Sequence, residues 1–183
     1  MIRLHSPRLA PLLAGAGLLA FLLSAGPAAA DTVRFRVTLV TAAALGATIG
    51  TVRADDTPRG LRLTPLLKSL APGVHTLSFH QKGDCAPATV EGRKLPAGAA
   101  GGVLAPTPKD ASAEAKASSD AKAVPAAPAA VSVPLTVDKD GIARTGVLLP
   151  GLKLEMVAGR AMIIAAERGA AREAIACGVV PSP

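Results

Sequence analysis

The chain has 183 residues, half of them hydrophobic, and a formal net charge of +7 at pH 7. It contains no Trp or Tyr and only three Phe, so it lacks the aromatic platform on which single-stranded nucleic acids stack. The basic residues are scattered and do not form runs, and we therefore expect no nucleic-acid partner.

Residues 1–30 have the pattern of a secretory signal peptide. Arg3 and Arg8 precede an apolar stretch, and the small residues that follow end in an A-x-A cleavage site. The alternative is a membrane anchor, but proline and glycine interrupt the apolar run. We expect cleavage before Asp31, no membrane span afterwards, and one domain, 31–183, that is periplasmic or secreted.

Alternation of apolar and polar residues predicts three strands in the first half of the domain. They cover 33–39, 47–54 and 61–67, with a polar turn at 55–58 between the second and the third. Pro65 has no backbone N–H to donate, so we expect the end of the third strand at a sheet edge or a bulge.

A fourth strand is predicted over 74–80, and its side chains separate onto two faces because successive residues of a strand point to opposite sides. One face carries Val74, Thr76, Ser78 and His80, and the other carries His75, Leu77 and Phe79. A loop to about Gly92 and a short run over 97–104 are expected to follow.

Residues 105–130 consist almost wholly of Ala, Pro, Lys, Asp, Ser and Glu. Such a segment buries too little apolar surface to offset the entropy lost on ordering, so we expect a flexible loop. A short helix over 111–123 is the alternative, although no apolar stripe would dock it.

The second half of the chain is predicted to contain further short strands. Asp140-Gly141 is a favourable hairpin dipeptide, so 142–149 is expected to pair with 131–137. The remaining runs are 152–157, 161–165 and 174–180. Short strands at this spacing, with turns between them, predict an all-β fold, a Greek-key β-sandwich or barrel. Met156 and Met162 lie in apolar runs and are expected to fill the core.

The chain has two cysteines, Cys85 and Cys177. An even number in an exported protein favours one disulfide. Reactive or metal-binding cysteines are the alternative, although neither lies in a C-x-x-C pair.

Several motifs resemble the copper/zinc superoxide dismutase family. They are the run from Pro72 to Cys85, the pair Gly101-Gly102, and Cys177-Gly178 near the end of the chain. The resemblance implies a superoxide dismutase-like barrel. It implies a structural role for His75 and makes His80 the equivalent of one copper ligand.

The resemblance also shows which ligands are missing. Family members bind copper and zinc with six histidines and an aspartate, whereas this chain has three histidines, of which His5 lies in the signal peptide. Three lost ligand equivalents are Ser78, Val103 and Ala165. No histidine lies in 105–130, where the zinc ligands would be expected.

The residues that guide superoxide also differ from the family pattern. Ala174 occupies the position of the arginine that holds the anion, with Arg172 nearby as a substitute. The family's electrostatic loop is shortened to 166–173. Charge steering of the substrate is therefore expected to be lost as well.

We therefore expect no catalytic residues, no bound cofactor and no dismutase activity. The protein would act as a binding or structural module, pairing with a protein partner, either a second copy or a true dismutase protomer. Two alternatives remain: weak binding of copper, zinc or haem through His80, and residual copper-dependent dismutation of superoxide.

Overall fold

The fold is known from a computed structural model, which describes residues 32–105, 131–168 and 171–182. The predicted signal peptide, 1–30, and nearly all of the predicted loop, 106–130, lie outside the described residues. Within the described part of the chain, no helix has the length and apolar character needed to cross a bilayer.

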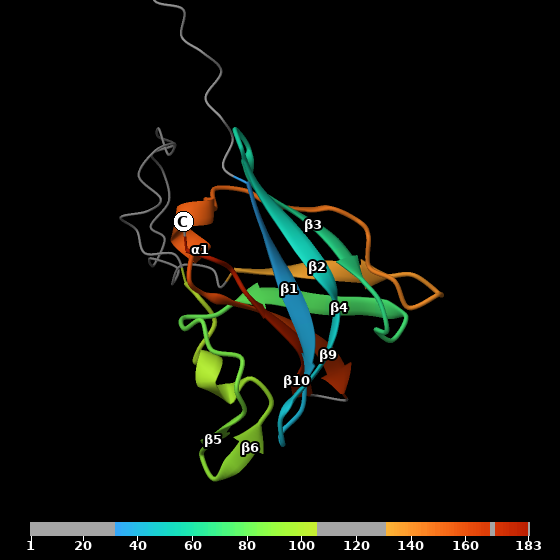
Figure 1. The fold of residues 1–183 in the computed structure, drawn as a ribbon, viewed down its shortest axis with the longest axis vertical. Coiled ribbons are helices and arrows are strands. Elements are labelled where there is room, and N and C mark those ends of the chain that lie inside the picture. The colour runs from blue at the N-terminus through green and yellow to red at the C-terminus, as the bar shows by residue number, and fades with distance from the viewer. Residues whose placement is uncertain (1–31, 106–130, 169–170, 183) are drawn as a thin grey trace, which may run out of the picture.

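The described residues form ten β-strands and two short helical segments (Figure 1). The elements are β1 (Thr32–Val40), β2 (Leu45–Thr57), β3 (Gly60–Leu67), β4 (Gly73–Phe79), β5 (Ala88–Val90), β6 (Arg93–Leu95), the 3-10 helix η1 (Gly98–Ala100), β7 (Ser132–Val137), β8 (Val147–Leu149), α1 (Leu154–Val157), β9 (Ala161–Arg168) and β10 (Ala171–Val179). Eight strands form one antiparallel sheet in the order β7-β4-β9-β10-β1-β2-β3-β8, and β5 pairs with β6 in a separate hairpin.

The large sheet curls around the larger of the two apolar clusters that the described residues form. Alternate residues of its strands point inward, and the largest fully buried side chains include Phe79, Leu61, Leu77, Leu135 and Met162. Met156 packs half-buried against the same cluster. The expected all-β, Greek-key fold is confirmed, because eight mutually paired antiparallel strands enclose this core.

Pro65 lies within β3, which keeps an unbroken register with β2 from Gly60 to Leu67. On its other side, β3 pairs with β8 only over Leu61–Leu63, and the next bridge joins Leu67 to Ala143. β3 is therefore not an edge strand, because β8 lies beyond it, but it is unpaired on that side at Pro65, where no N–H donor is needed and no bulge forms.

The predicted hairpin between 131–137 and 142–149 is wrong. The turn forms, with the Asp138 N–H donating to the Ile142 carbonyl at 2.9 Å, but the strands then diverge. β7 pairs with β4 and β8 pairs with β3. An Asp-Gly dipeptide specifies the local turn, whereas the partner of each strand is decided by where its apolar side chains are buried.

Two further segments differ from expectation. Residues 152–157 contain the short helix α1, in which Leu154 and Val157 are buried three positions apart and the Leu154 N–H donates to Asp56 Oδ1 at 2.8 Å. The stretch after Cys85 contains the β5–β6 hairpin, which projects from the main sheet (Figure 1). Three-residue strands carry too short an alternation to be recognised in a sequence.

Candidate functional site

The outer side of β4 and β9 carries the positions that the resemblance assigns to metal ligands. On β4, Leu77 and Phe79 point into the core, so Ser78 and His80 lie on the opposite side. Thr76 pairs with Ala165 of β9, and the backbone of His80 bridges to Val103. The structure thus brings Ser78, His80, Val103 and Ala165 into one region of the sheet.

Both ring nitrogens of His80 have partners within the chain. Nδ1 lies 2.8 Å from the Gly101 carbonyl oxygen, and Nε2 lies 3.1 Å from Ser78 Oγ. A carbonyl can only accept, so Nδ1 carries the proton and donates it. With the proton on Nδ1, Nε2 of a neutral ring is an acceptor, and the Ser78 hydroxyl donates a hydrogen bond to it.

This arrangement changes what Ser78 does. The resemblance puts a copper ligand at this position, but the serine hydroxyl donates a hydrogen bond to the nitrogen through which His80 could bind a metal. A metal needs the lone pair that the hydroxyl now occupies. Ser78 is also only 6% exposed, which keeps water from replacing it easily.

A second apolar cluster covers the outer side of β9 and β10. It consists of Val40, Ala97, Ala100, Ala161, Ile163 and Cys177, with Cys85 and Ala174 packed against it. Ile163 pairs in register with Ser78, so this cluster begins immediately beside the serine. Apolar side chains occupy a region where a metal centre would need nitrogen, sulfur or oxygen donors.

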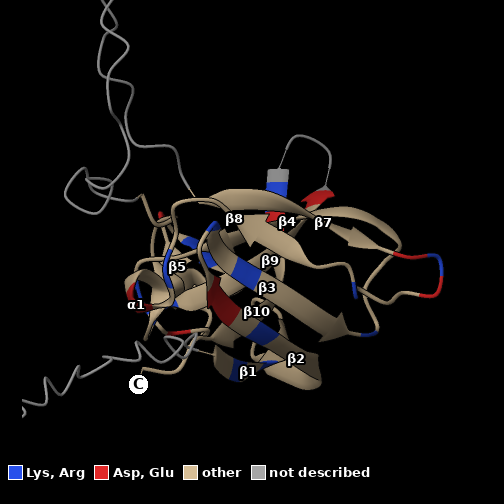
Figure 2. Ribbon diagram, turned by 90° about the horizontal axis from the view of Figure 1, so that it is seen from above, with Lys and Arg blue, Asp and Glu red and all other residues tan. Residues whose placement is uncertain are grey.

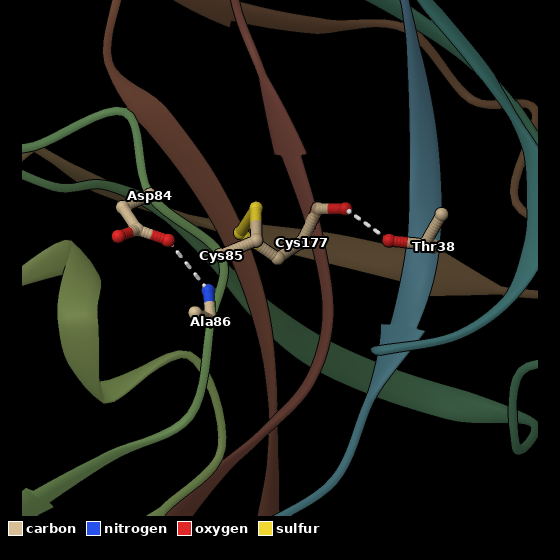
Figure 3. The surroundings of a disulfide bond; sticks show 5 residues. All are labelled: Thr38, Asp84, Cys85, Ala86 and Cys177. Atoms are coloured by element: carbon tan, nitrogen blue, oxygen red, sulfur yellow. Dashed lines mark hydrogen bonds between the residues drawn. A yellow bond between two sulfur atoms is a disulfide. The ribbon is translucent and has the colours of Figure 1, made fainter. Parts of the chain in front are cut away.

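The expected disulfide between Cys85 and Cys177 is confirmed, with an S–S distance of 2.02 Å. It joins the loop after β4 to β10 beside β1 (Figure 3). In this view the Thr38 hydroxyl donates to the Cys177 carbonyl at 3.3 Å, and the Ala86 N–H donates to Asp84 Oδ1 at 2.8 Å. The loop that covers the outer apolar cluster is therefore covalently attached to the sheet.

His75 lies on the core side of β4 and is only 5% exposed. Its Nε2 donates to the Ala71 carbonyl oxygen at 2.7 Å, which ties the loop before β4 to the strand itself. Its Nδ1 is buried and has no hydrogen-bond partner among the described residues. The geometry suits a structural side chain, and the role of His75 as a tether remains a prediction.

The position expected to carry the superoxide-guiding arginine lies on β10. Ala174 pairs with Ala165 of β9, so two altered positions of the family pattern face each other. Arg172, the nearest arginine along β10, forms an ion pair with Glu167 at 2.8 Å. Its guanidinium is thus partly neutralised by a carboxylate.

The described donors do not fit a copper or a zinc ion. Within residues 32–105, 131–168 and 171–182, no group of three or more His, Cys, Asp or Glu side chains could hold a metal. His80 has both nitrogens engaged, and both cysteines are joined to each other. Copper and zinc sites in proteins use three or four such donors.

Two contributors to this region were not recognised from the sequence. The Gly101 carbonyl holds the His80 ring, and Arg160 donates to the carbonyls of Met156 and Gln81 at 3.0 and 2.7 Å. Arg160 thereby fastens α1 and the residue after His80 to the start of β9. Backbone carbonyl acceptors such as that of Gly101 leave no pattern in a sequence. The position of Arg160 directly after Gly159 could have indicated an arginine that binds nearby backbone carbonyls.

Comparisons with known proteins agree on one family. The model of the family described as copper/zinc superoxide dismutase matches residues 48–180. The chain is 38% identical over 146 residues to "Superoxide dismutase [Cu-Zn] 2" of Salmonella typhimurium, covering 78% of this chain and 79% of the relative. It is 32% identical over 174 residues to "Superoxide dismutase [Cu-Zn]" of Escherichia coli, covering 89% and 95%.

Solved structures show the same fold. The copper/zinc superoxide dismutase of Brucella abortus matches with a TM-score of 0.65 at 23% identity, over 82% of this chain and 99% of that protein. The monomeric copper, zinc superoxide dismutase from Salmonella enterica, solved in solution, matches with a TM-score of 0.64 at 31% identity over the same shares. The likeness extends over nearly all of those two domains.

Proposed function

Because this chain belongs to the copper/zinc superoxide dismutase family, we propose that it keeps the family barrel as a binding or structural module and does not dismutate superoxide. The observation that carries this proposal is the state of His80. Its two ring nitrogens are engaged by Gly101 and Ser78, so neither nitrogen of this imidazole is free to bind a metal.

The chemistry of dismutation explains why this matters. A metal must accept an electron from one superoxide and return it to the next, so the protein must hold it in both oxidation states. Imidazole nitrogens suit copper in this role. With Ser78, Val103 and Ala165 at ligand positions, the chain supplies one histidine there, and that histidine is already hydrogen-bonded.

The role we propose is exerted outside the cytoplasm. After cleavage before Asp31, the barrel would be periplasmic or secreted, where the disulfide between Cys85 and Cys177 is maintained. A sheet face would pair with a second copy of the chain or with a true dismutase protomer. The scaffold is retained while the metal-ligand positions are altered. This combination supports a role in which the protein binds a partner through its surface and catalyses no reaction.

Dismutation is tested on the pure protein supplied with copper and zinc. The decay of superoxide should be no faster than with the same concentrations of free metal, and a chelator should abolish what remains. Catalysis that survives the chelator, at a rate proportional to protein concentration, would contradict the proposal.

Binding through His80 is tested in the same preparation. Copper, zinc and haem are titrated into the wild-type protein and into His80→Ala, and absorption spectra are compared. We expect the two proteins to give the same spectra. A spectral change that the substitution removes would establish the second candidate, a metal or haem carrier.

The partner is sought by isolating tagged protein from the cell envelope without denaturant and measuring its mass by sedimentation. We expect a mass above that of the single chain. A monomer with nothing attached at every stage of the isolation would count against the module role while leaving the loss of dismutation untouched.

A further inference from the structure

We propose that the outer face of β1, β2 and β3 binds the surface of a bilayer that contains anionic phospholipid. The residues that carry this inference are four arginines, which we call the arginine face: Arg34, Arg36, Arg53 and Arg62. All four are exposed, while the residues between them along each strand are buried or half-buried. The inference is independent of the loss of dismutase activity.

The strand register gathers these side chains from distant parts of the sequence. Arg34 lies directly opposite Arg53 across β1 and β2, and Arg36 is two positions further along β1 on the same side. Arg62 of β3 pairs with Asp55 of β2, two positions from Arg53. Figure 2 shows the basic positions along the adjacent ribbons of β1, β2 and β3. The charges look scattered in the sequence because strand alternation and pairing are needed to assemble them.

The chain itself neutralises only part of the arginine face. Asp55 forms an ion pair with Arg53 at 2.7 Å and also accepts a hydrogen bond from the Thr32 hydroxyl at 2.7 Å. Among the described residues, no ion pair involves Arg34, Arg36 or Arg62. Arg34 and Arg53 also face each other as like charges, an arrangement that disfavours the strand pair. An anion bound over the face would pair with the arginines that lack a carboxylate partner within the described part of the chain and would reduce the repulsion between Arg34 and Arg53.

The chemistry of the face favours lipid phosphate over other anions. Guanidinium groups bind phosphate oxygens through two parallel hydrogen bonds. Leu66, in the same outward row as Arg62, is 58% exposed and could enter the interfacial layer of a bilayer. A second copy would bring arginine against arginine, and both described phenylalanines, Phe35 and Phe79, are buried, so no aromatic ring is available to stack on bases.

The test is sedimentation of the protein, as isolated from cells, with two kinds of vesicle. One contains equal parts of phosphatidylglycerol and phosphatidylcholine, and the other contains phosphatidylcholine alone. The variant Arg34→Gln/Arg36→Gln is compared with Arg93→Gln/Lys94→Gln, which removes the same charge from exposed positions of β6, in a separate two-stranded sheet. Thermal unfolding of each variant confirms that it is folded.

We expect the wild type to bind the anionic vesicles and not the neutral ones, with binding lost in about 1 M salt, where the Debye length is about 3 Å. Arg34→Gln/Arg36→Gln should bind about 30-fold more weakly, since each basic residue near an anionic surface contributes somewhat less than a tenfold gain. The β6 variant should bind within about twofold of the wild type.

Three results would overturn the inference. They are equal weakening in the two variants, no preference for anionic over neutral vesicles, and tighter binding to a short DNA duplex than to the anionic vesicles. Equal weakening would mean that total charge matters and the arginine face does not. Tighter DNA binding would assign the face to nucleic acid.

Discussion

Ser78 and His80 form the pair on which the functional account depends. The serine hydroxyl donates to Nε2 at 3.1 Å, and the Gly101 carbonyl accepts from Nδ1 at 2.8 Å. A hydrogen-bonded imidazole in a partly buried position is held in one tautomer and one orientation. The pair therefore holds the His80 ring in place at the end of β4, with both ring nitrogens hydrogen-bonded.

Ser78→Ala tests this pair directly. Removing the hydroxyl leaves Nε2 without its donor, which should cost about 1 kcal/mol of unfolding free energy and lower the melting temperature by about 2 to 4 °C. The matched control is Ser132→Ala, since Ser132 is exposed and pairs in register with Ser78 on β7. Equal melting temperatures for the two variants would show that the hydrogen bond contributes nothing to stability.

Asp138 makes stability depend on pH. Its pKa is lowered from 3.8, first because its carboxylate accepts the Ile142 N–H and then because Arg144 and the Asp140 N–H also bind it. A carboxyl whose pKa is lower in the folded chain stabilises it above the pKa of the unfolded chain, and this contribution is lost as the pH falls through the folded value.

Asp138→Asn should therefore melt below the wild type at neutral pH, and the difference should shrink once the pH falls below about 4. Melting temperatures of both proteins from neutral pH to about pH 2 provide the comparison. A difference that is constant over this range would mean that the charge of Asp138 plays no part.

Residues 85–101, which follow β4, cover the outer side of β9 and β10. The 3-10 helix of this segment supplies the buried Ala100, and Cys85 fixes its start to Cys177. The same segment supplies the Gly101 carbonyl that holds His80. The disulfide therefore holds the start of this segment, and the hydrogen bond from His80 holds its end.

Replacing both cysteines, Cys85→Ser/Cys177→Ser, should cost about 4 to 5 kcal/mol, because the bridge closes a long loop in the unfolded chain. For a domain of this size the melting temperature should fall by about 10 °C or more. Reducing the wild type with dithiothreitol should give the same fall and leave the double variant unchanged. A fall of less than about 2 °C in the double variant would show that packing alone holds the loop.

Much of the fold could be predicted because a strand with one buried face needs an apolar residue at every second position, and this pattern is visible in the sequence. Alternation located β1, β2, β3 and β4, since one face of each is more buried than the other, whereas β9 was visible only as a continuous apolar run because both of its faces are buried. The partners of β7 and β8 could not be read locally, because the Asp140-Gly141 turn is compatible with strands that separate beyond it. Helix α1 is too short to show helical periodicity.

Only part of the candidate site could be inferred before the structure was known. The resemblance to the family implies that Ser78, Val103 and Ala165 replace ligands, and this remains a prediction. The hydrogen bonds that engage His80 depend on the position of the Gly101 carbonyl, which only the folded chain defines. The arginine face likewise needs the register of three strands.

At the scale of the molecule, a family barrel persists around a site that has no metal-binding donor set among the described residues. The most direct test is the metal content of the protein isolated from its own cell envelope in metal-free buffer. We predict far less than one copper or zinc per chain, unchanged in His80→Ala. One tightly held copper or zinc per chain in the wild type would contradict the account.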